Sequence, residues 1–166
     1  MTATTTSTDF STLTGTYALD TAHSRIGFVA RHAMVTKVRG SFNEFEGATT
    51  IDGTNPENST VSVTLKVESI DTRNAQRDGH LRTNDFLDLE NYPEIKFVST
   101  AITHQGGNDF EVTGDLTIKD VTKSITFPLE FQGAARDPFG NDRIGFEGST
   151  SLKRSESAAR QLYEDI

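Results

Sequence analysis

Two histidines that flank an apolar run are the first candidates for chemistry in this sequence. His23 and His32 lie in the stretch 20–32, DTAHSRIGFVARH, which is predicted to be a strand. Side chains nine positions apart on a regular strand face opposite sides, so these imidazoles reach one metal ion only across a bulge. A zinc site needs three or four converging ligands, whereas His80 and His104 lie in distant segments. We therefore expect the histidines either to hydrogen-bond backbone or carboxylate groups at a strand end or to lie at a pocket mouth.

A hydrolytic site would have to come from three neighbours, Asp20, His23 and Ser24. Adjacent side chains on a strand diverge, so these three do not form a triad there. The chain has no Gly-x-Ser-x-Gly motif, and its lack of cysteine excludes disulfides, thiolate metal sites and cysteine nucleophiles. The sequence therefore predicts a protein that is not an enzyme and that carries no cofactor.

A basic cluster interrupts the acidic chain in the segment 71–92. Its cations are Arg73, Arg77, His80 and Arg82. On a helix, Arg73 and Arg77 share one face, and their guanidinium groups suit a phosphate or a quinone head group at the mouth of a cavity. The alternative is pairing within the chain, because three aspartates are interleaved with the cations: Asp71, Asp78 and Asp85.

The elements that would position these residues are mostly strands. Apolar residues alternate with polar ones along most of the chain, as at Val61, Val63, Leu65 and Val67, so one face of each strand is apolar. Turn signals at 52–56, 105–109 and 137–142 separate the runs. This pattern predicts an antiparallel sandwich or barrel. The segment 71–92 has no alternation and predicts one or two short helices near residues 72–91.

Composition limits the class of protein. A chain of 166 residues fits one domain, and it contains no apolar run long enough to cross a membrane as a helix. A net charge of −8 argues against nucleic acid as a partner. The start MTATTTSTDFSTLTG lacks the features of a secretory signal, which predicts a cytoplasmic protein, and it is too polar to order itself.

The apolar face could be either a solid core or the wall of a cavity. Eleven phenylalanines and no tryptophan give an interior without polar atoms, and a barrel of about eight strands is either filled by side chains or holds one small ligand. Gly114 and Gly148 stand at inward positions. We expect them to leave space there, which favours a cavity.

The order of short motifs resembles the YceI-like family. The matching pieces are Tyr17-x-x-Asp20-x-x-His23-Ser24-x-x-x-Phe28-x-x-x-His32, Val38-Arg39-Gly40-Ser41-Phe42, Ser69-Ile70-Asp71-Thr72, Asn74-x-x-Arg77-Asp78-x-His80-Leu81, Asp85-Phe86-Leu87-Asp88, Tyr92-Pro93-x-Ile95-x-Phe97, Gly114-x-Leu116-Thr117-Ile118-Lys119 and Asp137-Pro138-x-Gly140-x-x-Arg143-x-Gly145-Phe146. They cover roughly residues 15–154. The resemblance implies an antiparallel, lipocalin-like β-barrel whose elongated apolar interior binds a polyisoprenoid chain.

The end of the sequence departs from this family. After Leu152-Lys153-Arg154-Ser155-Glu156, relatives usually continue into a long closing strand, whereas this chain reads SAARQLYEDI. In that stretch the apolar residues fall at i, i+3, i+4 and i+7, which predicts an amphipathic helix. A barrel without its last strand would expose an edge for a partner subunit, the tail helix or a rearranged strand to cover. A homodimer is one way to do so.

These observations lead to one preferred interpretation: an arm at 1–14, a barrel domain at 15–154, an atypical tail at 155–166, and a non-catalytic carrier of a polyprenyl phosphate or an isoprenoid quinone. The predicted tunnel residues are Phe28, Phe42, Val63, Leu65, Phe97, Phe110, Leu116, Phe127, Leu129 and Phe146. The residues predicted near the head group are His32, Arg77 and His80. Two alternatives stay open: a stress-related interaction module with a filled core that dimerises through the truncated edge, and a metal-dependent enzyme that uses His23, His32 and His80.

Overall fold

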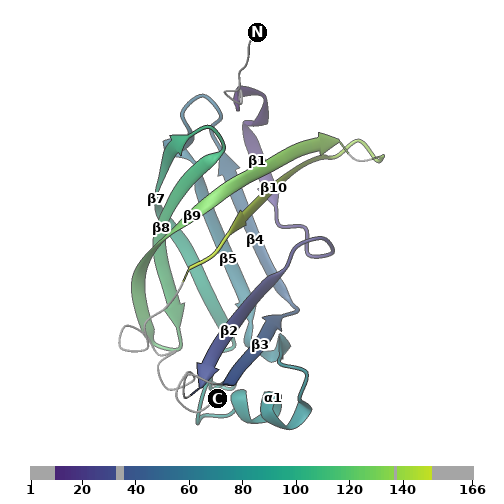
Figure 1. Cartoon of the computed structure of the whole chain (residues 1–166), viewed down its shortest axis with the longest axis vertical. Helices are drawn as coiled ribbons and strands as arrows, with labels where there is room; N and C mark the ends of the chain where they lie inside the picture. Colours follow the sequence, from purple (N-terminus) through teal and green to yellow (C-terminus); the bar gives the residue numbers. More distant parts are fainter. Residues whose placement is uncertain (1–9, 33–35, 137, 151–166) are drawn as a thin grey trace.

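The computed structural model describes residues 10–32, 36–136 and 138–150, of which residues 30–32 and 36–37 are described by their backbone only. Antiparallel strands dominate it (Figure 1), as the alternation predicted. The larger sheet has seven strands, in the spatial order β1 (Gly15–Ala18), β4 (Phe45–Ile51), β5 (Thr60–Lys66), β7 (Glu94–Gly106), β8 (Asp109–Ile118), β9 (Val121–Arg136) and β10 (Asp142–Gly148).

This seven-stranded sheet curls into a half-barrel. Figure 1 shows β9 and β10 passing across the front of β4 and β5, which lie behind them. Within the described residues, β1 and β10 are the outer strands of the sheet, and each pairs with one neighbour only. The all-β, lipocalin-like fold is therefore confirmed, with its two outer strands not paired to each other in this part of the chain.

A second sheet completes the lower part of the molecule in Figure 1. It contains three strands in the order β2 (Ile26–His32), β3 (Thr36–Phe42) and β6 (Ile70–Asp71). Paired residues of antiparallel strands share a face. Phe28 pairs with Gly40 and Ile26 with Phe42, so this sheet has an apolar inner face.

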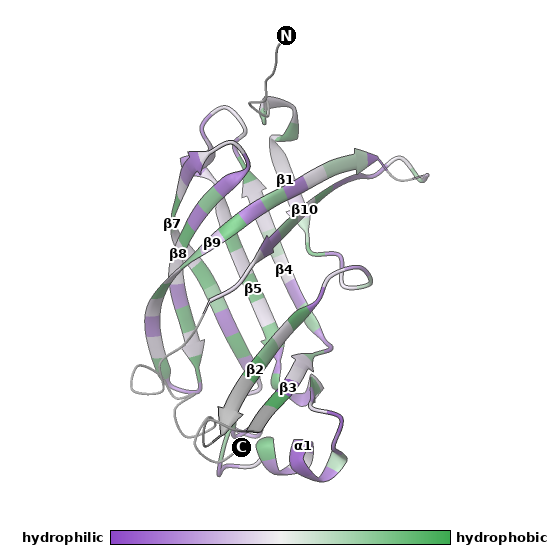
Figure 2. Ribbon diagram, in the orientation of Figure 1, coloured by the Kyte–Doolittle hydropathy of each residue, from purple (hydrophilic) through white to green (hydrophobic). Residues whose placement is uncertain are grey.

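Alternating polarity explains why these segments are strands. Figure 2 shows hydrophilic and hydrophobic residues taking turns along β7, β8 and β9. On β8 the alternation places Phe110 and Val112 in the interior, while Glu111 between them is exposed. An antiparallel sheet with one wet face has this pattern.

The segment without alternation forms the helix that was predicted. α1 (Ala75–Leu81) begins after Asn74, whose side chain accepts a hydrogen bond from the backbone N–H of Arg77 at 3.0 Å. The rest of the segment is turns. Among the described residues no helix is long and apolar enough to cross a membrane. The predicted C-terminal helix and the tail 155–166 lie outside the described residues.

The stretch 20–32 is only partly a strand, which corrects the sequence prediction. β2 begins at Ile26, and a turn precedes it. The side chain of Asp20 accepts a hydrogen bond from the backbone N–H of Ala22 at 3.1 Å, and its carbonyl accepts one from the N–H of His23 at 3.2 Å. An aspartate that satisfies local backbone donors in this way favours a turn over an extended strand.

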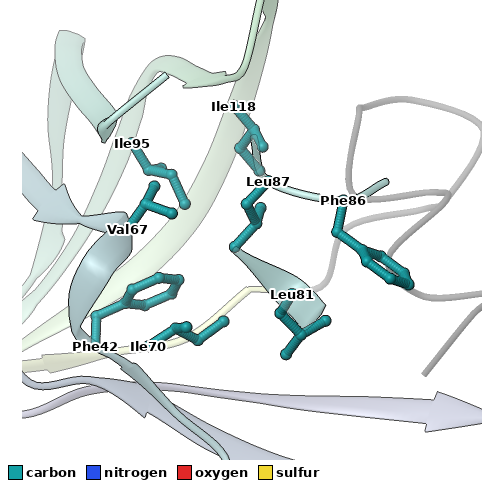
Figure 3. Close-up of a cluster of buried hydrophobic side chains, with 8 residues drawn as sticks. All are labelled: Phe42, Val67, Ile70, Leu81, Phe86, Leu87, Ile95 and Ile118. Carbon is teal, nitrogen blue, oxygen red and sulfur yellow. The ribbon is translucent and has the colours of Figure 1, made fainter. Parts of the chain in front are cut away.

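The lower core joins the small sheet, α1 and the large sheet. Eight buried side chains form it (Figure 3): Phe42, Val67, Ile70, Leu81, Phe86, Leu87, Ile95 and Ile118. Ile70, Leu81 and Val67 are each only 1% exposed. These buried side chains join the small sheet and α1 to the large sheet.

The upper core lies within the curl of the large sheet. It consists of Phe10, Ile102, Phe110, Val112 and Phe131. Phe10 precedes the 3₁₀ turn η1 (Ser11–Leu13), and its ring lies edge-on against the rings of Phe110 and Phe131, each at 5.4 Å. Residues 10–13, assigned by sequence to the N-terminal arm, therefore pack against the sheet.

Candidate functional site

A large cavity occupies the concave side of the seven-stranded sheet. Its volume is about 1380 Å³, and every strand of the seven-stranded sheet contributes to its wall, together with the start of β2. Apolar side chains from strands far apart in the sequence line it, among them Val61, Ile102, Val112, Leu129, Ile144 and Phe146. Such a volume exceeds the roughly 300–1,000 Å³ of ordinary ligand pockets. This open cavity is large enough to hold a long molecule against its apolar side chains.

A charged cluster borders this cavity where the β1–β2 turn approaches β10. The carboxylate of Asp20 accepts a hydrogen bond from Nδ1 of His23 at 2.9 Å and forms an ion pair with Nη1 of Arg143. The hydrogen bond from His23, aided by the N–H of Ala22 and by Arg143, lowers the pKa of Asp20 below its usual 3.8. Asp20 is therefore ionised at neutral pH, and it connects the turn to β10.

This cluster corrects one inference from the sequence. Asp20 and His23 were expected to diverge, but the turn brings their side chains together because the strand starts later. The described residues include no hydrogen bond between His23 and Ser24, and they include no group of three histidine, aspartate or glutamate side chains that could hold a metal ion. The contacts of Asp20 with His23 and Arg143 hold these three polar side chains in place at the cavity wall.

Comparison with known proteins identifies the family. The model of the YceI-like domain matches residues 17–159. The chain belongs to the YceI-like family. A UPF0312 protein of Photorhabdus laumondii is 41% identical over 145 residues, which are 86% of this chain and 75% of that protein.

Solved structures agree with this assignment to the YceI-like family. The YCEI protein of Campylobacter jejuni is 32% identical, with a TM-score of 0.70 over 90% of this chain and 91% of that one. A domain of Saccharophagus degradans described as polyisoprenoid-binding is 17% identical, with a TM-score of 0.54 over 72% of this chain and 68% of that one. The second likeness is a likeness of fold.

Only some of the ten predicted tunnel residues line the cavity in this YceI-like fold, and the upper core itself forms part of the cavity wall. Four of them line the large cavity: Val63, Phe110, Leu129 and Phe146. The others pack in or against the two cores. Phe28, Phe42, Leu65 and Leu116 belong to the lower core, and Phe97 and Phe127 pack against the upper core. Period-two alternation places all ten inward, but it does not distinguish a wall from a core.

The predicted glycine gaps are absent, which corrects the argument made from them. A methyl group at Gly114 would lie 2.5 Å from Cζ of Phe97, and one at Gly148 would lie 2.7 Å from the carbonyl oxygen of Pro128. The ring of Phe97 therefore covers Gly114, and neighbouring backbone crowds Gly148. These glycines permit close packing. The cavity volume arises from the curl of the sheet.

Two of the three predicted head-group residues, Arg77 and His80, have described side chains, and neither lines the large cavity. Nε of Arg77 donates to Oγ1 of Thr72 at 2.9 Å, and its Nη2 donates to the carbonyl of Thr72 at 3.0 Å. His80 lies 3.3 Å from Asp85 and edge-on to the ring of Phe86. The backbone of His32 pairs with Thr36, and its side chain lies outside the description. Arg77 and His80 remain predictions as ligand contacts.

Sequence reasoning missed the pair of Asp20 and Arg143 as a border of the cavity. Both residues belong to motifs on which the family resemblance rests, and that was the available signal. Nothing in local spacing links them, because they are separated by 123 positions.

Proposed function

We propose that this protein binds and carries a long isoprenoid lipid in its large cavity, without making or breaking covalent bonds. One observation carries the proposal: the apolar cavity of about 1380 Å³ on the concave side of the sheet. The shared fold with a domain described as polyisoprenoid-binding supports it. A polyprenyl phosphate and an isoprenoid quinone both fit this class of ligand.

The free energy of burial determines how long the chain must be. A buried methylene contributes about 0.8 kcal/mol, so a five-carbon unit contributes roughly 4 kcal/mol. Association costs about 4–15 kcal/mol in lost freedom of motion. Several isoprene units are therefore needed for firm binding, and the head group mainly orients the ligand.

Organic extraction of freshly purified full-length protein, followed by mass spectrometry, tests the proposal. The parent protein should yield a long-chain isoprenoid lipid. Ile144→Glu puts a charge on the cavity wall and should abolish the bound lipid, whereas Val98→Glu changes a side chain that is 53% exposed and should retain it. Empty extracts from the parent, or equal lipid in both variants, would contradict the proposal.

A homodimer is a second candidate, favoured by one observation on β10. Phe146, which also lines the cavity, is large, apolar and 40% exposed on this outer strand. Outer strands offer unpaired backbone groups to another chain. Light scattering should then report a dimer for the parent and a monomer for Phe146→Glu, and a monomeric parent would exclude this candidate.

A further inference from the structure

A short segment before the first strand forms one end of the large cavity. Phe10 precedes η1 and Leu13 ends it, and both residues line the cavity. Figure 1 shows this purple segment at the top of the molecule, near the turn that joins β7 and β8. Both residues lie before the stretch 17–159 that matches the YceI-like domain. This part of the wall therefore comes from outside the matched domain.

The ring of Phe10 is held by aromatic rings from three strands. It lies edge-on to His104 on β7 at 5.6 Å, and to Phe110 on β8 and Phe131 on β9 at 5.4 Å each. His104 is fixed in turn, because its Nε2 donates to the carbonyl of Gly107 at 2.8 Å and its ring stacks on Phe110 at 4.7 Å. Edge-to-face contacts favour one orientation of each ring. Phe10 is only 8% exposed, so its ring is a fixed part of the wall.

The backbone around η1 is fixed as well. The hydroxyl of Tyr17 donates to the carbonyl of Leu13 at 2.9 Å, and the N–H of Gly53 donates to Oγ1 of Thr14 at 2.9 Å. Gly53 lies so close that a methyl group on it would collide with the carbonyl group of Phe10. Only a glycine permits this approach. The segment is therefore attached to β1 and to the turn after β4, and it holds Phe10 in place.

The end of the cavity at Phe10 differs in polarity from the part near the β1–β2 turn. Ile102, Phe110 and Phe131 surround Phe10. Of the described residues that line the cavity, those with ionisable acidic or basic side chains come from residues 20–25 and from β10: Asp20, His23, Arg25, Asp142 and Arg143. The four residues of β1 lie between Phe10 and Asp20 and span roughly 13 Å. The wall at Phe10 therefore suits the hydrocarbon end of a ligand.

We propose that Phe10 limits the length of the lipid chain that the cavity holds, because its ring stops the hydrocarbon end of the chain. A fixed ring in a wall cannot move aside at low cost, since its three aromatic contacts would be lost. This inference rests on the proposed function and deepens it, because it names the residue that selects among isoprenoid chains by length.

The stop has a measurable consequence for affinity. Each further methylene that a ligand buries strengthens binding about fourfold. Once the chain reaches Phe10, further methylenes stay in water and add nothing. A plot of affinity against chain length should therefore rise and then level off. The smaller side chain of Phe10→Leu should move the limit to longer chains, and the larger one of Phe10→Trp should move it to shorter chains.

Competition binding to the delipidated full-length protein tests this, with straight-chain primary alcohols of increasing length displacing a fluorescent long-chain alcohol. An alcohol just longer than the parent's limit should bind Phe10→Leu at least about fourfold more tightly than the parent. The matched control is Phe86→Leu, because Phe86 is also 8% exposed but belongs to the lower core and does not line the cavity. Its limit should equal that of the parent.

The outcomes separate this inference from the proposed function. Opposite shifts of the limit in Phe10→Leu and Phe10→Trp support the stop, since a residue that only stabilised the fold would not produce them. An unchanged limit in both variants, or an equal shift in Phe86→Leu, overturns the stop and leaves the proposed function standing. If no alcohol binds the parent, the stop and the proposed function both fail.

Photocrosslinking of the parent protein tests the same contact without any substitution. The probe is a primary alcohol at the parent's length limit, with a diazirine at its hydrocarbon end. After irradiation and digestion, mass spectrometry should find the label on residues 10–13 or on their neighbours Phe110 and Phe131. A label confined to residues 20–25 would overturn the inference, because the hydrocarbon end would then lie away from Phe10.

Discussion

The guanidinium group of Arg143 on β10 forms an ion pair with the carboxylate of Asp20, which lies 123 positions earlier in the chain. Both residues border the large cavity, and His23 completes the contact from the other side of Asp20. The pair connects an outer strand of the large sheet with the turn that leads into the small sheet. We therefore expect it to hold the cavity border in place.

Because of this ion pair, we expect the free energy of unfolding to decrease at acidic pH. The pKa of Asp20 is below its usual 3.8 in the folded protein, chiefly because of the hydrogen bond from His23. Such a group stabilises the folded state above its unfolded pKa, and this contribution is lost as the pH falls through the folded pKa. Asp20→Asn should therefore be less stable than the parent at neutral pH, and the difference should vanish in acid. Denaturant unfolding across pH measures this. Asp115→Asn on β8 is the control, and a difference that persists in acid would contradict the expectation.

The buried hydroxyl of Thr72 should matter for stability. Thr72 is 4% exposed, and its hydroxyl donates to Asp78 and accepts from Arg77. Thr72→Val leaves both partners short of a hydrogen bond, so we expect a loss of about 1–3 kcal/mol in the free energy of unfolding. Urea denaturation measures it. Thr126→Val, at an exposed position, should change stability by less than about 0.5 kcal/mol; similar losses in the two variants would refute the role given to Thr72.

Two glycine substitutions should have opposite effects. Gly114→Ala places a methyl group 2.5 Å from the ring of Phe97, so it should destabilise the protein by about 1–3 kcal/mol. Gly79→Ala lies in α1 with nothing within 4 Å and should stabilise it by roughly 0.5–1 kcal/mol. Thermal unfolding distinguishes the two. A neutral Gly114→Ala would mean that the interior has room after all.

Phe10 should anchor the start of the described chain. It is 8% exposed and contacts two rings of the upper core. Phe10→Ala should cost about 2–5 kcal/mol, whereas Phe139→Ala, at a side chain that is 87% exposed, should cost little. Equal stability of the two variants, measured in guanidinium chloride, would show that the N-terminal segment contributes nothing to the fold.

Local patterns were sufficient for the strands and the helix. Alternation assigns an inner and an outer face to each strand because side chains point to opposite sides of a pleated chain. On β8, for example, it separates Val112 from Glu111 correctly. The helix cap at Asn74 and the turns at 107–108 and 138–139 are equally local. Ordered motifs were enough to identify the YceI-like family.

Specific side-chain contacts could not be predicted from these local patterns. The turn at Asp20 replaced a predicted strand because a side chain satisfied nearby backbone donors better than an extended conformation would. Gly114 suggested empty space, and the ring of Phe97 from a neighbouring strand fills it. Arg77 binds Thr72, a contact that the spacing of the basic residues did not indicate. In each case, the residue that makes the contact is not indicated by the period-two alternation, because alternation assigns only the inner and outer face of a strand.

The sequence by itself therefore determined the class of fold, the faces of the strands and the family, because all three follow from short-range order. The tertiary structure alone decided which inward residues line the cavity and which are packed away from it. It also brought Asp20 and Arg143 together at the border of the cavity. The physical reason is that the curl of the sheet and the pairing of charges depend on which strands meet, and strand pairing is a property of the whole chain.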